Sequence, residues 1–91
     1  MLILNEDRDI IINLSNIIDI EVEEESSGIS SINAYFDYDD FVQLGTYKTE
    51  RAYEILREIF ERYSAVKQYE MPKESYNDWR NYCKTLATRT L

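Results

Sequence analysis

The sequence of 91 residues contains no histidine and only one cysteine, Cys83. Without histidine, the chain cannot assemble a Ser-His-Asp or Cys-His nucleophile system from its own residues. A structural zinc site with cysteine and histidine ligands is excluded for the same reason, which leaves oxygen-ligand cations such as Ca²⁺ as metal candidates. One cysteine cannot form an intrachain disulfide, and this scarcity is typical of a reducing compartment.

Glycine, proline and long apolar runs are also scarce. Two glycines and one proline leave no room for a flexible linker. The longest apolar runs are only a few residues, so we expect neither a signal peptide nor a membrane-spanning helix. With 44% hydrophobic residues available for one modest core, we expect a single soluble, cytoplasmic domain over residues 1–91.

Basic side chains are almost missing from the first half of the chain. The net charge is −8, but residues 1–46 hold eleven acidic side chains and one basic side chain, Arg8. Residues 47–91 hold seven acidic and nine basic side chains. Because nucleic-acid binding requires a basic patch, direct binding of DNA or RNA is not expected.

The first half has the alternating pattern of β-strands. Ile18, Ile20 and Val22 alternate with acidic residues, which is typical of a strand with one face in the core. In the next strand, Ile32, Ala34 and Phe36 are expected to face inward. Together the segments predict an antiparallel meander of about five strands within residues 1–48, at 2–4, 10–14, 17–23, 29–37 and 41–47.

From Thr49 the apolar spacing changes to three and four residues, which predicts a main helix over residues 49–68 with Thr49 as its N-cap. Arg57–Glu61 and Glu58–Arg62 are expected to pair on its exposed face. The segment at Pro72 breaks this helix, and a short C-terminal helix is expected within residues 73–91. The predicted fold class is therefore α+β, a meander packed by one long helix plus the short C-terminal helix. The apolar stripe of the main helix comprises Ala52, Ile55, Leu56, Ile59, Phe60, Tyr63 and Val66.

Three segments, "LNEDRDIIINLSNIIDI", "LGTYKTERAYEILREI" and "YEMP", resemble a family of small uncharacterised proteins from low-GC Gram-positive bacteria, their phages and other mobile elements. The resemblance covers residues 1–72 and implies a β-meander followed by a helix, in the cytoplasm of a bacterial host cell. It implies no catalytic residues, and residues 73–91 extend beyond the usual end of the family. The matching positions are Asn5, Asp7, Asn13, Asn16, Ile17, Ile20, Leu44, Gly45, Tyr47, Ala52, Leu56, Ile59, Met71 and Pro72.

Eight carboxylates between Asp19 and Asp40 are the candidate functional groups. Catalysis is not expected, because acids that alternate with core positions are solvated and keep ordinary pKa values. The segment "DYDDFVQLGTYK" begins like a calcium-binding EF-hand loop. It has Phe41 at the fifth position, however, and lacks the glycine at the sixth and the glutamate at the twelfth. We therefore predict no metal, no cofactor and no enzymatic activity.

Two readings of these acids remain open: a surface that keeps the protein soluble and protects a sheet edge, or a negative surface for a basic partner. Acids alternating along a strand are about 6.6–6.8 Å apart, and neighbouring acids could bring this density close to the ~3.4 Å phosphate spacing of one DNA strand. The second reading predicts a protein-binding module that resembles, in size and charge, phage proteins that inhibit host defence nucleases such as RNA-guided ones. Its contact residues would be Asp19, Glu21, Glu23, Glu24, Glu25, Asp37, Asp39 and Asp40.

The aromatic residues of the last segment support an alternative function. Tyr and Trp are favoured in protein interfaces, and Tyr76, Trp79 and Tyr82 share one stripe of the expected C-terminal helix. This alternative is a scaffolding or self-associating module, in which homo-oligomers form through these residues. Cys83 lies on the same stripe and is expected to be a buried, unreactive thiol.

Overall fold

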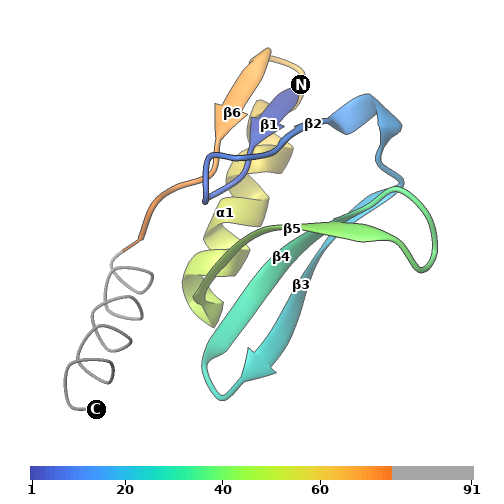
Figure 1. Ribbon diagram of the computed structural model, residues 1–91. Helices are drawn as coiled ribbons and strands as arrows, with labels where there is room; N and C mark the ends of the chain where they lie inside the picture. The colour runs from blue at the N-terminus through green and yellow to red at the C-terminus, as the bar shows by residue number, and fades with distance from the viewer. Residues whose placement is uncertain (75–91) are drawn as a thin grey trace.

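The structure of the protein is a computed structural model (Figure 1), and residues 1–74 are the part of the chain that it describes. This part of the chain is α+β, with six strands in two small sheets and one helix. The C-terminal helix expected within residues 73–91 lies, from Ser75 onward, outside the described residues. The elements are β1 (Leu2–Leu4), β2 (Ile11–Asn13), β3 (Asp19–Ser26), β4 (Ile29–Tyr35), β5 (Phe41–Lys48), α1 (Thr49–Arg62) and β6 (Gln68–Glu70).

The prediction of one continuous five-stranded meander was wrong, because the strands divide into two sheets. The first sheet has the order β2-β1-β6, and the second has the order β3-β4-β5. The chain leaves the first sheet through a 3-10 turn at Leu14–Asn16. The Asn13 carboxamide oxygen accepts from the Ser15 backbone N–H at 3.1 Å and from its hydroxyl at 2.8 Å. These bonds give the polar groups of Ser15 a partner within the turn, so β2 ends at Asn13 and does not continue into β3.

The first sheet is completed by a strand that sequence analysis did not predict. β1 pairs antiparallel with β2 and parallel with β6, with Ile3 opposite both Ile12 and Tyr69. The three strands lie together at the end of the molecule that holds the N-terminus (Figure 1). Tyr69 is buried between the exposed Gln68 and Glu70, which is the alternation of a short strand.

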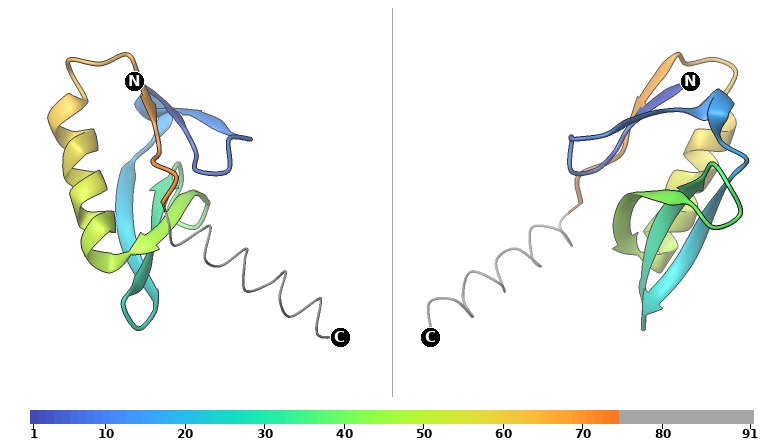
Figure 2. Two further views of the ribbon diagram at one scale, coloured as in Figure 1. Left: turned by 90° about the vertical axis from the view of Figure 1, so that its left-hand side faces the viewer. Right: turned by 45° about the vertical axis from the view of Figure 1, so that its right-hand side comes forward.

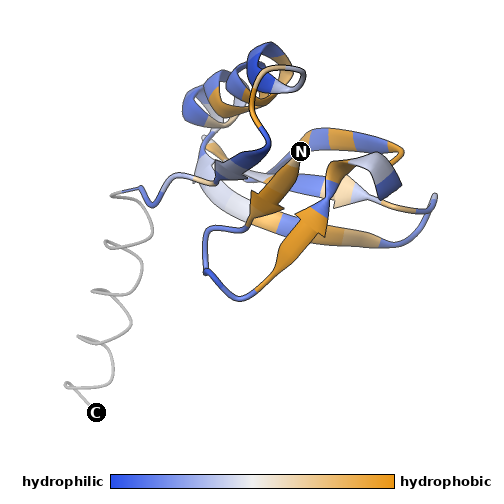
Figure 3. Ribbon diagram, turned by 90° about the horizontal axis from the view of Figure 1, so that it is seen from above, coloured by the Kyte–Doolittle hydropathy of each residue, from blue (hydrophilic) through white to orange (hydrophobic). Residues whose placement is uncertain are grey.

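The second sheet carries α1 on one face (Figures 2 and 3). Ile32 and Ala34 are fully buried, as predicted, whereas Phe36 is exposed. Phe36 was expected to face inward, but β4 ends at Tyr35 and the Phe36 N–H donates to the Asp40 carbonyl within a turn. Because Ile32 and Ala34 lie on the α1 side of β4, the residues that alternate with them lie on the face opposite α1.

Helix α1 ends six residues earlier than predicted. The apolar stripe is only partly correct: Ala52, Ile55 and Ile59 are buried, but Phe60, Tyr63 and Val66 are exposed. The helix stops at Arg62 because the chain must turn back to place β6 beside β1, and the Arg62 carbonyl accepts from the N–H groups of residues 65 and 66.

Helix α1 begins at Thr49 as predicted, but its N-cap and one of its two expected surface pairs differ from the prediction. The N-cap is Lys48, without a side-chain capping bond, and the Thr49 hydroxyl pairs with that of Ser30 at 2.8 Å. The predicted Arg57–Glu61 pair is confirmed at 3.2 Å. Glu58 instead accepts from the Tyr69 hydroxyl at 2.6 Å, and the Arg62 guanidinium lies over the Tyr69 ring. These two contacts attach α1 to β6.

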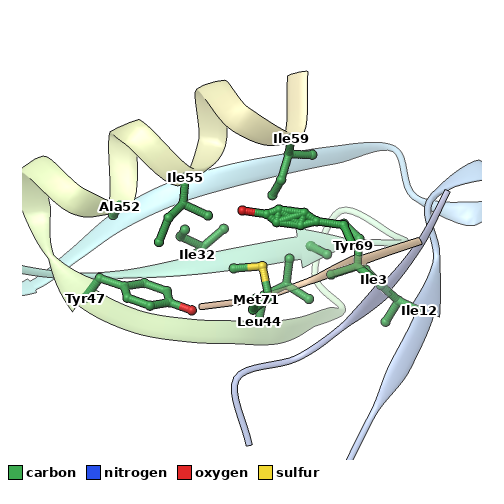
Figure 4. Close-up of a cluster of buried hydrophobic side chains, with 11 residues drawn as sticks. Ile3, Ile12, Ile32, Leu44, Tyr47, Ala52, Ile55, Ile59, Tyr69 and Met71 are labelled. Carbon is green, nitrogen blue, oxygen red and sulfur yellow. The ribbon is translucent and has the colours of Figure 1, made fainter. Parts of the chain in front are cut away.

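The core joins both sheets and the helix (Figure 4). Met71 lies between the tyrosine ring of residue 47 and the first sheet, and it is fully buried. The Tyr47 hydroxyl donates to the Pro72 carbonyl at 2.8 Å, which ties the segment after β6 to β5. The buried hydrophobic residues are Ile3, Ile12, Ile32, Ala34, Leu44, Tyr47, Ala52, Ile55, Ile59, Tyr69 and Met71.

A buried glutamate connects the first sheet to the outer edge of β5. The Glu6 backbone N–H donates to the Leu44 carbonyl at 2.7 Å, and its carboxylate accepts from the Thr46 N–H at 3.0 Å. Burial raises the pKa of Glu6 above its usual range. Because the β1–β2 turn thus occupies the edge of β5, the edge of the second sheet that remains open among residues 1–74 is that of β3.

Candidate functional site

The face of β3 opposite α1 carries three carboxylates in a row, which we call the acidic ladder: Asp19, Glu21 and Glu23. The alternation in the sequence places them there, since Ile20 and Val22 pack partly buried against the core on the other face. Asp19 and Glu21 are exposed, as predicted. Among residues 1–74, the ladder lies on the terminal strand of its sheet, so no other strand of this part of the chain pairs with its outer edge.

Glu23 differs from the other two members of the ladder because its carboxylate is hydrogen-bonded. One oxygen accepts from the Asn33 side-chain amide at 2.9 Å, and the other accepts from the Tyr35 hydroxyl. Asn33 is only 2% exposed, although it lies on the face opposite α1. The bond to Glu23 is the main reason that the pKa of Tyr35 is raised to about 12. Glu23 was predicted to be solvated; the structure makes it half-buried and anchored to β4.

Glu21 lies between the other two carboxylates of the ladder. Reduced hydration and the neighbouring carboxylates of Asp19 and Glu23 raise the pKa of Glu21 above its usual range. Like charges on alternate positions of one strand repel each other, and no basic residue occurs anywhere in residues 9–47 to offset them. A positive group brought to this face would therefore meet carboxylates that no basic residue of the same strand offsets.

Substitution of Glu23 tests whether its carboxylate stabilises the fold by holding Asn33 and Tyr35. Glu23→Ala is expected to lower the free energy of unfolding by about 1–3 kcal/mol, because Asn33 and Tyr35 lose their shared acceptor. Chemical denaturation at pH 7 measures this change.

Glu21→Gln is the matched control and is expected to have the opposite sign. Since the folded-state pKa of Glu21 is raised, its ionised form destabilises the fold above that pKa and has no effect below the unfolded pKa. Glu21→Gln is therefore expected to stabilise the protein at pH 7, with the gain disappearing as the pH falls through this interval. An equal loss of stability in both variants at pH 7 would contradict the assigned roles.

The other five predicted contact residues lie in two groups, one at each end of the β3–β4 hairpin. Glu24 and Glu25 lie near the β3–β4 turn, and Glu24 follows the alternation onto the α1 side of the strand. Asp37, Asp39 and Asp40 lie in the β4–β5 turn, at the opposite end of β4. The two groups are separated by the length of the hairpin, about 17 Å for five steps of strand.

A groove that sequence analysis missed lies between α1 and β3. It has a volume of about 880 Å³, with Ile20 of β3 and Leu56 of α1 among its lining residues. Its rim includes Tyr53, Phe60 and Tyr63, whose side chains are 57%, 78% and 52% exposed. The sequence did contain a signal for it, because Leu56, Phe60 and Tyr63 belong to the apolar stripe predicted for the helix.

Other kinds of site find no support within residues 1–74. No three histidine, cysteine, aspartate or glutamate side chains in this part of the chain are grouped so that they could hold a metal ion. Within the same residues, no helix has the length and apolar character needed to cross a membrane. The alternative contact residues Tyr76, Trp79 and Tyr82, and also Cys83, lie outside the described part of the chain.

Comparisons with known proteins do not assign the chain to a family. No family model matches the sequence, and no curated protein or solved structure matches it significantly. The resemblance to small proteins of Gram-positive bacteria and their mobile elements therefore remains a prediction from the quoted segments.

Proposed function

We propose that the protein is a small, non-enzymatic binding module of phage or mobile-element origin that binds a basic surface of a protein partner through the exposed part of its acidic ladder. The observation that carries this proposal is the placement of Asp19 and Glu21. Both are exposed on a terminal strand, in a stretch without any lysine or arginine between residues 9 and 47. In its sharper form, the partner is a host defence nuclease, such as an RNA-guided one, whose nucleic-acid groove is occupied.

The electrostatics of the ladder support a partner rather than a purely solubilising role. A surface that only keeps the protein soluble requires net charge, and acidic and basic side chains can be interspersed on it to lower the repulsion between like charges. Here the like charges are kept next to each other, and their mutual repulsion contributes to the raised pKa of Glu21. Glu23 holds Asn33 and Tyr35 in place beside the ladder, which orders this face before a partner binds. An ordered negative face loses less conformational entropy on association.

Charge reversal of the two exposed members tests the proposal. Asp19→Lys/Glu21→Lys is expected to weaken binding to the basic partner by about a hundredfold, as for the loss of two close interfacial charge pairs. The assay uses a panel of purified RNA-guided nucleases from low-GC Gram-positive bacteria and measures inhibition of target-DNA binding. Inhibition by the parent protein is also expected to decrease steeply with ionic strength.

The matched control is Asp7→Lys/Glu70→Lys, which changes the net charge equally, with Asp7 in the β1–β2 turn and Glu70 in β6. Both residues are exposed and distant in topology from β3. Glu23 is left unchanged, because its loss would alter stability as well as charge. If no nuclease of the panel is inhibited, or if both double variants inhibit as well as the parent, the proposal fails.

A further inference from the structure

β3 is the open edge of the second sheet. It pairs with β4 along one side, and no other strand among residues 1–74 pairs with its other side. At the opposite edge of the sheet, on β5, the Glu6 backbone N–H and carboxylate bind the Leu44 carbonyl and the Thr46 N–H. An unpaired edge presents backbone N–H and C=O groups that can accept a further strand.

The open edge has a different chemistry on each of its two faces. On the face opposite α1 lie the carboxylates of Asp19 and Glu21. On the α1 face lies the apolar groove, with Ile20 in its lining and Phe60 and Tyr63 at its rim. These two aromatic side chains are 78% and 52% exposed, so nothing in the described part of the chain covers them.

We propose that the edge of β3 binds an extended segment of a protein partner as an added strand, in which basic residues alternate with apolar ones. An added strand lies about 4.8 Å from β3, and its side chains point alternately to the two faces. Those on one face come to about 4.5–5.5 Å from Asp19 and Glu21, a distance that favours lysine or arginine. Those on the other face enter the groove below Phe60 and Tyr63, which favours apolar side chains.

A second copy of the chain does not satisfy this chemistry. Pairing β3 with β3 of another copy would place acidic ladders side by side, and like charges on neighbouring strands are destabilising. The last segment of the chain is basic, but its apolar residues Tyr76, Trp79, Tyr82 and Leu86 are spaced by three and four rather than by two. A separate partner with period-two alternation fits both faces of the edge.

This inference rests on the proposed function, since both use the acidic ladder, but it specifies the form of the partner. The probe is a capped peptide of about ten residues in which lysine and valine alternate. We expect it to bind the full-length protein, with NMR shift changes along β3 and along the groove-lining side of α1. A peptide of the same composition with its lysines and valines in two blocks is expected to bind at least about tenfold more weakly, because it cannot place lysine and valine on opposite faces.

Backbone methylation separates strand pairing from charge attraction. Two alternating peptides are compared, methylated on odd or on even backbone nitrogens over the central residues. Only one set of N–H groups points toward β3 in the paired strand, so one isomer is expected to lose about tenfold or more in affinity. Equal affinity of both isomers and of the block peptide would show charge attraction alone and would overturn the inference.

Substitutions in the protein complete the test. Phe60→Ser/Tyr63→Ser is expected to weaken peptide binding by about tenfold, whereas Tyr38→Ser, on a side chain that is 89% exposed in the β4–β5 turn, is expected to leave it unchanged. The inference is also overturned if the alternating peptide does not bind the full-length protein. This holds whatever the cause, including a groove filled by residues 75–91 or by a second copy. If the methylated isomers bind alike while Asp19→Lys/Glu21→Lys abolishes nuclease inhibition, strand addition fails and the proposed function stands. If the peptides bind as expected but no nuclease is inhibited, strand addition stands and the proposed function fails.

Discussion

Gly45→Ala is expected to destabilise the protein by about 2–3 kcal/mol, as overpacking of a fully buried site does. A Cβ atom at residue 45 would lie 2.5 Å from the Tyr47 hydroxyl oxygen, 2.7 Å from Cε2 and 2.8 Å from Cζ of the same ring. The ring cannot move aside cheaply, because Tyr47 is fully buried and its hydroxyl donates to the Pro72 carbonyl. Chemical denaturation of the variant measures the loss.

Two comparisons isolate the contact with Tyr47 as the cause. Gly28→Ala meets no atom within 4 Å, so its cost comes only from the positive φ of +77° and is expected to be about 1 kcal/mol. The double variant Gly45→Ala/Tyr47→Leu is expected to be more stable than the sum of the two single losses predicts, because the smaller side chain removes the clash. Strict additivity would show that the ring does not press on residue 45.

Met71→Ala is expected to cost about 3 kcal/mol, within the range for truncation of a fully buried methionine. Met71 lies after β6, is 0% exposed and donates its backbone N–H to the Leu4 carbonyl at 2.9 Å. Its own carbonyl accepts from the Arg8 guanidinium at 2.7 Å. Because the backbone contacts persist in the variant, the loss reports the side chain alone.

Val66→Ala is the matched control for Met71→Ala. Val66 belongs to the predicted apolar stripe of the helix, but it lies beyond the end of α1 and is 37% exposed. Its substitution is expected to change the free energy of unfolding by less than about 0.5 kcal/mol. If Val66→Ala were the more damaging change, the chain would follow the longer helix that the sequence predicts, and residues 68–71 would not belong to the core.

The acidic ladder illustrates how much of the candidate site could be predicted from the sequence. Alternation of Ile20 and Val22 with acidic residues is a local property, and it correctly placed Asp19 and Glu21 on the exposed face. The distinct role of Glu23 could not be predicted, because it depends on Asn33 and Tyr35 of the neighbouring strand, ten and twelve residues away. The register of β3 against β4 decides which side chains reach its carboxylate.

The groove shows that the burial of helix residues, too, could be predicted only in part from the sequence. The helical spacing correctly predicted an apolar stripe, but not which part of the stripe the sheet would cover. Ala52, Ile55 and Ile59 are buried, whereas Phe60 and Tyr63 remain at the rim of the groove. How wide a sheet becomes depends on which strands join it, and that is decided by pairing between distant segments.

By itself, the sequence determined the α+β class, the start of α1, the exposed face of β3 and the absence of nucleophile systems that require histidine. Each of these follows from the composition or from the spacing of apolar residues, which is two in a strand and three to four in a helix. Such spacing is a property of residues that are close in the sequence. Only the tertiary structure decided the division into two sheets, the end of α1 at Arg62 and the strand at Gln68–Glu70. These depend on long-range contacts such as that of Arg8 with Met71, 63 residues apart. A local pattern holds no information about such a contact, because its free energy arises only when distant segments meet in the folded chain.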